Sequence, residues 1–226
     1  PSLTLSLSMQ KERASMVELN YRPLSALALN ARASQSPKSA PVHVWELPKR
    51  RMLTLRLDMA NTALVEKAEA AMGMSLPTKP NTLNAYDNDS YVLWTSPDEF
   101  MIDMPHSVGA SGADAVVMQA LTDALAGEFA LVADVSDQMA GIGLGGDMWR
   151  EVWSKVCALD VHESVFKPGE CGQTVAAKSN IVFYGPDATA ARVEHLRLYT
   201  RRSFSQYLFA RLEDGALEYG LSLQAL

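Results

Sequence analysis

The sequence has few cysteines and no long hydrophobic run, and both absences exclude a class of protein. Cys157 and Cys171 are the only cysteines among 226 residues. Two cysteines do not make a disulfide scaffold, so we expect both to be reduced and to serve as small buried hydrophobic side chains. No apolar stretch approaches the roughly 18 residues that a membrane helix needs, and no basic segment followed by an apolar run marks a secretory signal at the N-terminus. These absences predict a cytoplasmic protein without a membrane segment.

Positively charged residues are also fewer than negatively charged ones. Lys and Arg number 20 against 26 Asp and Glu, which gives a formal net charge of −6. A nucleic-acid-binding surface is basic, and the short basic clusters at residues 49–51 and 201–202 are typical of solvated ends of strands or helices. Nucleic acid is therefore not an expected partner. The share of hydrophobic residues, 48%, is that of an ordinary globular protein with a core.

Signatures of catalysis are missing as well. The sequence contains neither a G-x-S-x-G nucleophile motif nor a G-x-x-x-x-G-K-[ST] phosphate loop. The four histidines do not form a metal-ligand pattern with one another or with the cysteines; they are His43, His106, His162 and His195. We therefore predict that this chain holds no catalytic, cofactor-binding or metal-binding residue of its own.

One glycine-rich run matches a dinucleotide-binding motif literally. Residues 141–146 read G-I-G-L-G-G, which fits G-x-G-x-x-G. That motif needs its first glycine directly after a strand and an acidic residue about 20 positions later. Residues 136–140 separate the expected strand from Gly141, and Asp160 comes too early. A strand of small residues that packs closely against the next helix is the better interpretation.

Three aspartates lie near this run. Paired carboxylates perform acid–base chemistry when burial separates their pKa values. Asp134 and Asp137 flank a predicted turn, however, where Asp accepts backbone hydrogen bonds, and Asp147 precedes a predicted helix as its N-cap. We expect structural roles for all three.

The first 48 residues differ from the rest of the chain. Residues 30–41 are rich in Ala, Ser, Asn and Pro and have little apolar periodicity, so this segment buries too little surface to order by itself. Isolated apolar residues are spaced through it and after it: Leu24, Leu27, Leu29, Val42, Val44 and Trp45. We predict that residues 1–48 form an extended N-terminal arm that orders against a partner subunit; a floppy tail is the alternative.

Residues 49–226 are predicted to form one α+β domain of two halves, about 49–137 and 138–226. The first half reads strand, helix, strand, strand, helix, strand, at residues 52–58, 61–72, 91–95, 100–104, 113–126 and 129–135. Asn61 or Thr62 provides an N-cap and Gly73 a C-cap for the first helix. This order is the split β-α-β of a ferredoxin-like layer.

The second half repeats this order more loosely. Its expected elements are a strand, a helix, a hairpin, a strand and a final helix, at residues 142–144, 148–157, 173–177 with 181–184, 192–200 and 203–214. The chain thus predicts two sheet-and-helix halves packed together.

The run from Ala133 to Tyr184 carries a family resemblance. It reads D-V-S-D at residues 134–137, P-G at Pro168 and Gly169, and K-S-N at residues 178–180 before an apolar strand. This spacing resembles the first domain of the folate-dependent aminomethyltransferases, the glycine-cleavage T-proteins. In that family the turn before the strand carries two carboxylates, and here Ser179 and Asn180 stand in that turn. The resemblance implies an aminomethyltransferase-like fold that has lost its acids.

Over about residues 50–220 the chain is similar to the gamma subunits of heterotetrameric sarcosine oxidases. The resemblance rests on the order and spacing of short motifs: L-P-x-x-P-N-T at 76–82, L-W-x-x-P-D-E-F at 93–100, D-V-S-D at 134–137, C-x-L-D at 157–160, F-x-P-G-x-C-x-Q-T at 166–174, R-S-F at 202–204 and E-Y-G at 218–220.

This resemblance implies a role in a complex. The family's complexes oxidise the N-methyl group of sarcosine to give glycine, hydrogen peroxide and either formaldehyde or methylene-tetrahydrofolate; relatives act on other N-methyl amines. The implied partners are alpha, beta and delta subunits, and the implied cofactors FAD, FMN, NAD, tetrahydrofolate and zinc belong to those subunits. The gamma chain is implied to be non-catalytic. The alternatives are a stand-alone folate-dependent aminomethyl or methyl transferase and a folate-binding module.

Overall fold

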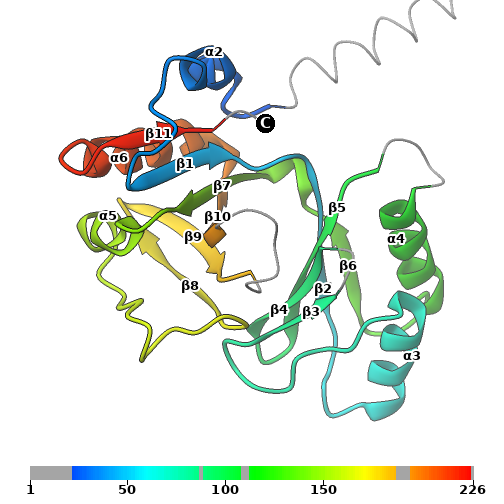
Figure 1. Cartoon of the computed structure of the whole chain (residues 1–226). Coiled ribbons are helices and arrows are strands. Elements are labelled where there is room, and N and C mark those ends of the chain that lie inside the picture. Colours follow the sequence, from blue (N-terminus) through cyan, green and yellow to red (C-terminus); the bar gives the residue numbers. More distant parts are fainter. Residues whose placement is uncertain (1–21, 87–88, 108–111, 187–193, 225–226) are drawn as a thin grey trace, which may run out of the picture.

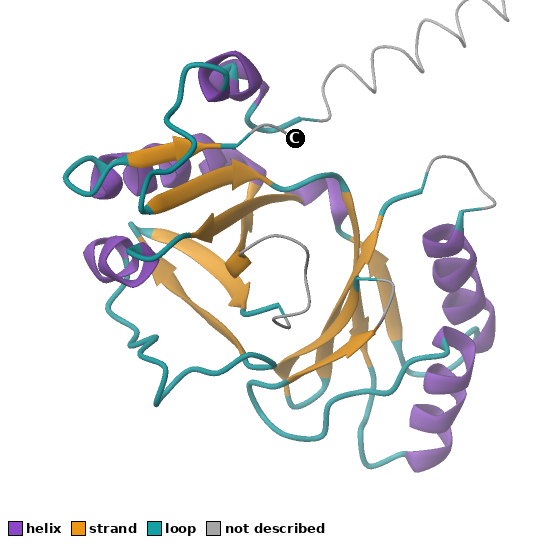
Figure 2. Cartoon of the chain, viewed as in Figure 1, coloured by secondary structure: helices purple, strands orange, loops and turns teal. Residues whose placement is uncertain are grey.

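Two β-sheets with helices on their outer faces make up the protein. The computed structural model describes residues 22–86, 89–107, 112–186 and 194–224. Helices α3 and α4 cover one sheet, helices α5 and α6 cover the other, and the inner faces of the sheets are turned toward each other (Figures 1 and 2). Among the described helices, none is both long enough and apolar enough to cross a membrane.

The first sheet has five strands in the order β3-β4-β5-β2-β6, all antiparallel. Its elements along the chain are β2 (Arg50–Arg56), α3 (Thr62–Met72), β3 (Leu83–Tyr86), β4 (Ser90–Ser96), β5 (Glu99–Pro105), α4 (Ala113–Ala124) and β6 (Leu131–Asp134). The Asn61 side chain accepts a hydrogen bond from the Leu64 N–H, and Gly73 has a φ of 66°. Both predicted caps of α3 are confirmed, and β3 is a strand that the sequence analysis did not find.

The second sheet has six strands in the order β11-β1-β7-β10-β9-β8. Its elements are β1 (Val42–Glu46), β7 (Met139–Gly145), α5 (Trp149–Val156), β8 (Cys171–Ala176), β9 (Ser179–Tyr184), β10 (Glu194–Arg201), α6 (Ser205–Ala216) and β11 (Leu221–Leu223). Short helical segments complete the described structure: η1 (Ser25–Leu27), α2 (Leu29–Ala33), η2 (Ser136–Gln138) and η3 (Arg202–Phe204).

The two sheets repeat one topology. The first sheet is built from the chain order β2-α3-β3-β4-β5-α4-β6 and the second from β7-α5-β8-β9-β10-α6-β11. Corresponding strands have corresponding neighbours in the two sheets, except that β1 is inserted between β7 and β11. Within each repeat, four strands and two helices follow the ferredoxin-like order. The predicted α+β class with two such halves is confirmed.

Strand β1 is where the structure differs most from expectation. It pairs antiparallel with β7 and parallel with β11, so residues 42–46 belong to the second sheet. Val42 and Val44 pack into the core beneath α5 and α6, whereas Trp45 points into the core between the sheets. The prediction that these apolar residues order against a partner subunit is wrong, because this chain's own sheet buries them. The beginning of the predicted arm, residues 1–21, lies outside the described ranges.

Alternation along the strands divides the interior into three cores. In β2, Leu53 and Leu55 face α3 and α4 while Met52 faces the opposite sheet, as the period of two requires. The core between the sheets consists of Trp45, Leu47, Met52, Leu83, Tyr91, Leu93, Met101, Cys171, Tyr184 and Tyr199. Each sheet therefore packs against its helices on one face and contributes to the core between the sheets on the other.

The glycines of β7 make room for aromatic side chains of this middle core. A Cβ atom on Gly143 would lie 2.0 Å from Cε2 of Trp45, and one on Gly141 would lie 2.9 Å from Tyr199 Cε1. Strand β7 is antiparallel to both of its neighbours, so it is not part of a dinucleotide-binding β-α-β unit. The predicted strand of small residues is confirmed, but its glycines face Trp45, Leu47 and Tyr199 rather than a helix.

Both cysteines are free thiols and are buried. The Cys171 Sγ donates to the carbonyl oxygens of Thr82 and Trp94 at 3.3 and 3.4 Å, and burial raises the pKa of this thiol to about 12. The predicted role as small buried side chains is confirmed.

Candidate functional site

The three aspartates near the glycine-rich run lie in separate surroundings. Asp134 Oδ1 accepts a bond from the Ser136 N–H at 2.9 Å, as predicted for a turn, and Asp137 lies 3.8 Å from Lys49 Nζ with 75% of its side chain exposed. The N-cap of α5 is Met148, and no side chain caps this helix. The predicted cap at Asp147 is wrong, because the helix begins one residue later than the sequence suggested.

The histidines also have separate partners. The ring nitrogens of His43 and His162 lie 2.9 Å from the Ala40 carbonyl oxygen and 2.8 Å from Ser164 Oγ. His106 Nδ1 lies 3.0 Å from Asp114 Oδ2, and the side chain of His195 is outside the described part of the structure. Within the described ranges, no three His, Cys, Asp or Glu side chains are grouped to hold a metal ion.

Ser179 and Asn180, which stand in the turn that bears acids in the aminomethyltransferases, begin strand β9. The preceding turn residues, Ala177 and Lys178, have φ values of 46° and 68°, and the predicted hairpin of β8 and β9 is confirmed. Ser179 is fully buried, its Oγ has no hydrogen-bond partner, and Asn180 is exposed.

A buried polar cluster between the two sheets was missed by the sequence analysis. We call it the inter-sheet cluster. Its members come from both sheets and from the turn before β4: Arg50, Asp89, Asp103, Tyr184, Arg197 and Tyr199. A signal for it was present, since Asp103 is a lone carboxylate inside the apolar strand F-M-I-D-M, and a buried acid requires partners.

Asp103 is the centre of the inter-sheet cluster. Its side chain is fully buried. Arg50 Nε donates to Oδ1 at 2.6 Å, and the hydroxyls of Tyr184 and Tyr199 both donate to Oδ2 at 2.6 Å. Because Arg50 belongs to the first sheet and both tyrosines to the second, this one carboxylate joins the two halves of the protein.

Asp89 closes the cluster on its other side. Its Oδ2 accepts from Arg50 Nη1 at 2.6 Å, and its Oδ1 accepts from Arg197 Nη2 at 3.0 Å. The Tyr91 hydroxyl donates to the same Oδ1 at 2.9 Å, and the Arg197 guanidinium lies over the Tyr91 ring. The cluster thus contains two guanidinium groups and two carboxylates.

The electrostatics of the cluster keep Arg50 charged and Tyr184 and Tyr199 neutral. Burial works against the charged form of Arg50, but Asp103 raises the pKa of this guanidinium above its ordinary value. Burial and the Asp103 charge raise the pKa values of Tyr184 and Tyr199 well above 10. Both phenols therefore remain hydrogen-bond donors at physiological pH. The arrangement suits a structural connection between the sheets better than proton transfer.

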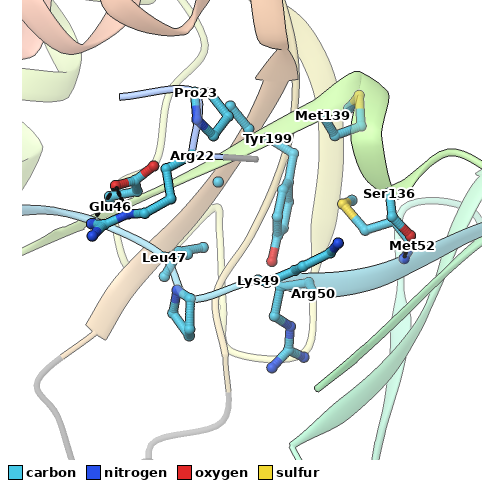
Figure 3. Close-up of a pocket in the computed structure, with 13 residues that line it drawn as sticks. Arg22, Pro23, Glu46, Leu47, Lys49, Arg50, Met52, Ser136, Met139 and Tyr199 are labelled. Atoms are coloured by element: carbon cyan, nitrogen blue, oxygen red, sulfur yellow. Dashed lines mark hydrogen bonds and ion pairs between the residues drawn. The ribbon is translucent and has the colours of Figure 1, made fainter. Parts of the chain in front are cut away.

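A cavity of about 330 Å³ adjoins this cluster (Figure 3). It is lined by Arg22, Pro23, Glu46, Leu47, Pro48, Lys49, Arg50, Met52, Ser136, Met139, Ala140, Gly141 and Tyr199. Arg22 and Glu46 lie on one side of Tyr199, with Met139 and Ser136 on the other.

The polar groups of this cavity are already engaged. Glu46 Oε2 accepts from Arg22 Nη2 at 2.8 Å, and its Oε1 accepts from the Leu24 N–H at 3.3 Å. Ser136 Oγ accepts from the Met52 N–H at 3.0 Å. The lining combines apolar side chains with paired charges, so the cavity has the chemistry of a packing surface rather than of an acid–base centre.

A second ionic group links β2 to α4. The Asp114 side chain is fully buried and accepts from Arg51 Nε at 3.0 Å and from the Ser107 N–H at 3.1 Å, with His106 Nδ1 3.0 Å away. Burial by itself would raise the pKa of this carboxyl, but the bonds from Arg51, His106 and Ser107 outweigh it and lower the pKa to about 2.

Replacing Asp114 by asparagine is expected to give a pH-dependent loss of stability. A carboxyl whose pKa is depressed in the folded state contributes fully above its unfolded pKa of about 4, and the contribution disappears as the pH falls toward 2. Asp114→Asn should therefore lower the free energy of unfolding by about 2 kcal/mol at neutral pH, and the deficit should shrink below about pH 4. Urea denaturation across this range measures the difference. Asp123→Asn, at an exposed position of the same helix, is the matched control, and a deficit equal at all pH values would contradict the assignment.

Comparisons with known proteins agree on one family. The model of the sarcosine oxidase, gamma subunit family matches residues 56–218. A curated sarcosine oxidase subunit gamma from Corynebacterium sp. (strain U-96) is 24% identical over 202 residues, which cover 89% of this chain and 92% of that protein. Another from Arthrobacter sp. is 29% identical over 115 residues, which cover 51% of this chain and only 53% of its relative.

Solved structures share the fold. A chain of heterotetrameric sarcosine oxidase from Corynebacterium sp. U-96, solved in complex with pyrrole 2-carboxylate, matches with a TM-score of 0.75 and 23% identity over 92% of this chain and 99% of that chain. Aminomethyltransferase T of the glycine cleavage system from Bartonella henselae matches with a TM-score of 0.56 and 12% identity over 76% of this chain and 45% of that chain. The predicted similarity to both groups of proteins is confirmed.

Proposed function

Because the chain belongs to the sarcosine oxidase gamma subunit family, we propose that it is a non-catalytic subunit of a hetero-oligomeric sarcosine oxidase. The proposed complex converts sarcosine to glycine with hydrogen peroxide and formaldehyde or methylene-tetrahydrofolate. In this proposal alpha, beta and delta subunits are the partners and hold FAD, FMN, NAD, tetrahydrofolate and zinc. The family match over most of the domain is the observation that carries the proposal.

The interior of the domain supports a structural role. The inter-sheet cluster joins Asp103 to Arg50, Tyr184 and Tyr199 with bonds of 2.6 Å. A general base must be able to leave its ground-state partners and reach a substrate proton. Asp103 has no exposed surface and is held by three donors, which favours a fixed architectural element.

The surface of the first half supports assembly. Phe129 is 97% exposed, and Leu131 on the edge strand β6 is 48% exposed. Both residues line one open depression together with Leu57 and Ala130. Permanent subunit interfaces bury on the order of 2,000 Å² or more and are largely apolar, so exposed aromatic and aliphatic side chains of this kind suit a chain that functions inside a complex.

Co-expression with the other subunits tests this proposal. An affinity tag on this chain should recover a yellow complex that produces hydrogen peroxide from sarcosine, while the chain expressed alone should show neither property. Isothermal titration of the isolated chain with tetrahydrofolate is the control for the two alternatives. Binding with micromolar affinity, or turnover of a methylated amine by the isolated chain, would overturn the proposal in favour of a transferase or a folate-binding module.

A further inference from the structure

An open pocket beside the N-terminal end of α6 is lined by three arginines. It has a volume of about 720 Å³. Its polar lining residues include Arg22, Gln138, Arg201, Arg202, Ser203 and Gln206. We call it the arginine pocket. It shares Arg22 and Pro23 with the cavity of Figure 3, and its other lining residues come from η1, η2, the end of β10, η3 and α6.

The charge of the arginine pocket is opposite to that of the whole chain. Three guanidinium groups line it. Glu46 offsets Arg22 by an ion pair of 2.8 Å, so Arg201 and Arg202 remain as an excess of two positive charges. Arg201 Nη1 donates at 3.1 Å to Gln138 Oε1, a neutral group. A local excess of positive charge on a chain of net charge −6 creates a field that selects an anionic partner.

Exposed aromatic side chains follow the arginines along the chain, outside the lining of the pocket. Phe204 is 46% exposed and Tyr207 is 44% exposed, one in η3 and the other in the first turn of α6. Arg and Tyr are the residue types that most often carry the binding energy of protein interfaces, and Phe is also enriched there. A small inorganic anion would use the arginines but leave both rings exposed, whereas a peptide segment covers both.

We propose that the arginine pocket binds an acidic segment of a partner subunit in the oxidase complex. This inference rests on the proposed function. Carboxylates of the segment pair with Arg201 and Arg202, whose planar guanidinium groups form two parallel hydrogen bonds to a carboxylate. An apolar side chain of the same segment covers Phe204 and Tyr207.

Charge reversal at both arginines tests the inference. The tagged chain is co-expressed with the other subunits as wild type, as R201E/R202E and as the control K79E/K167E, which makes the same change in net charge at exposed positions that do not line the pocket. Recovery of the complex should fall about ten-fold or more for R201E/R202E relative to the control, since interfacial charge pairs that are broken change affinity by this order. R201K/R202K keeps the charge and should retain an intermediate recovery. Thermal unfolding of each isolated chain checks that the variants fold.

The possible results distinguish a failure of the proposed function from a failure of this inference alone. If wild-type chain recovers no partner, the proposed function fails and the inference fails with it. If wild type assembles and R201E/R202E assembles as well as K79E/K167E, the inference alone is overturned. A poly-glutamate peptide should release the wild-type complex at a lower ionic strength than sodium chloride does. If inorganic phosphate released the complex at the same ionic strength as poly-glutamate, the pocket would be a site for small anions, and the proposal of an acidic segment would be overturned.

Discussion

Replacing Asp103 by alanine is expected to lower the free energy of unfolding by about 3–5 kcal/mol. The change leaves Arg50, whose side chain is 5% exposed, with Asp89 as its remaining carboxylate partner, and it leaves the hydroxyls of Tyr184 and Tyr199 without their shared acceptor. Breaking a buried ion pair by removing one partner is costly because the other charge stays in a medium of low polarity. Urea denaturation followed by tryptophan fluorescence measures the loss.

Two further variants make the Asp103 experiment specific. Asp137→Ala removes a carboxylate that is 75% exposed and should change stability by less than about 0.5 kcal/mol. Arg50→Met combined with Asp103→Leu removes both charges at similar volume and should recover part of the loss, because no uncompensated charge remains. If Asp103→Ala cost less than about 1 kcal/mol, the inter-sheet cluster would not be a significant link between the two halves.

Replacing Gly143 by alanine is expected to cost about 3 kcal/mol, the upper end of the usual range for overpacking a core. The added Cβ would lie 2.0 Å from Cε2 of Trp45, far inside van der Waals contact. The indole is 2% exposed and β7 is paired on both edges, so neither the ring nor the strand has room to move. Thermal and urea denaturation of the purified variant measure the effect.

A double-mutant cycle identifies the clash as the cause. In Trp45→Ala combined with Gly143→Ala, the alanine at position 143 has no ring to meet, so the two changes should cost less together than the sum of the single variants. Gly215→Ala is the matched control, because its nearest contact would be 3.3 Å away and Ala is favoured over Gly inside a helix such as α6. Additive costs at positions 45 and 143 would show that the loss has another source.

Local sequence signals predicted much of the fold. Asn61 and Gly73 fix the ends of α3 through their own backbone and side-chain chemistry, and the period of two in β2 follows from one face toward the helices and one toward the other sheet. Strand β1 was misassigned, and β11 was not found. They have five and three residues, too few to display a period, and what makes them strands is their pairing with each other and with β7.

Local sequence signals could not predict the inter-sheet cluster either, because its members are far apart in the sequence. Asp103 and its partner Tyr199 are separated by 96 positions, and Arg50 is 53 positions from Asp103 on the other side. No spacing rule joins residues so far apart. What the sequence offered was the family resemblance over about residues 50–220, which the family match over residues 56–218 confirms.

The insertion of β1 between β7 and β11 affects how the protein folds during translation. The five strands of the first sheet lie within residues 50–134, so that sheet is complete early in translation, whereas Val42 must wait for its neighbour Leu221. Pairings between such distant residues form slowly, and chains generally fold from the N-terminal side as they emerge from the ribosome. During that interval β1 has only β7 as a neighbour, and helix α6, which packs over Val42 and Val44, is not yet in place. Nascent chains are therefore most prone to aggregation after the first half has folded and before β11 arrives.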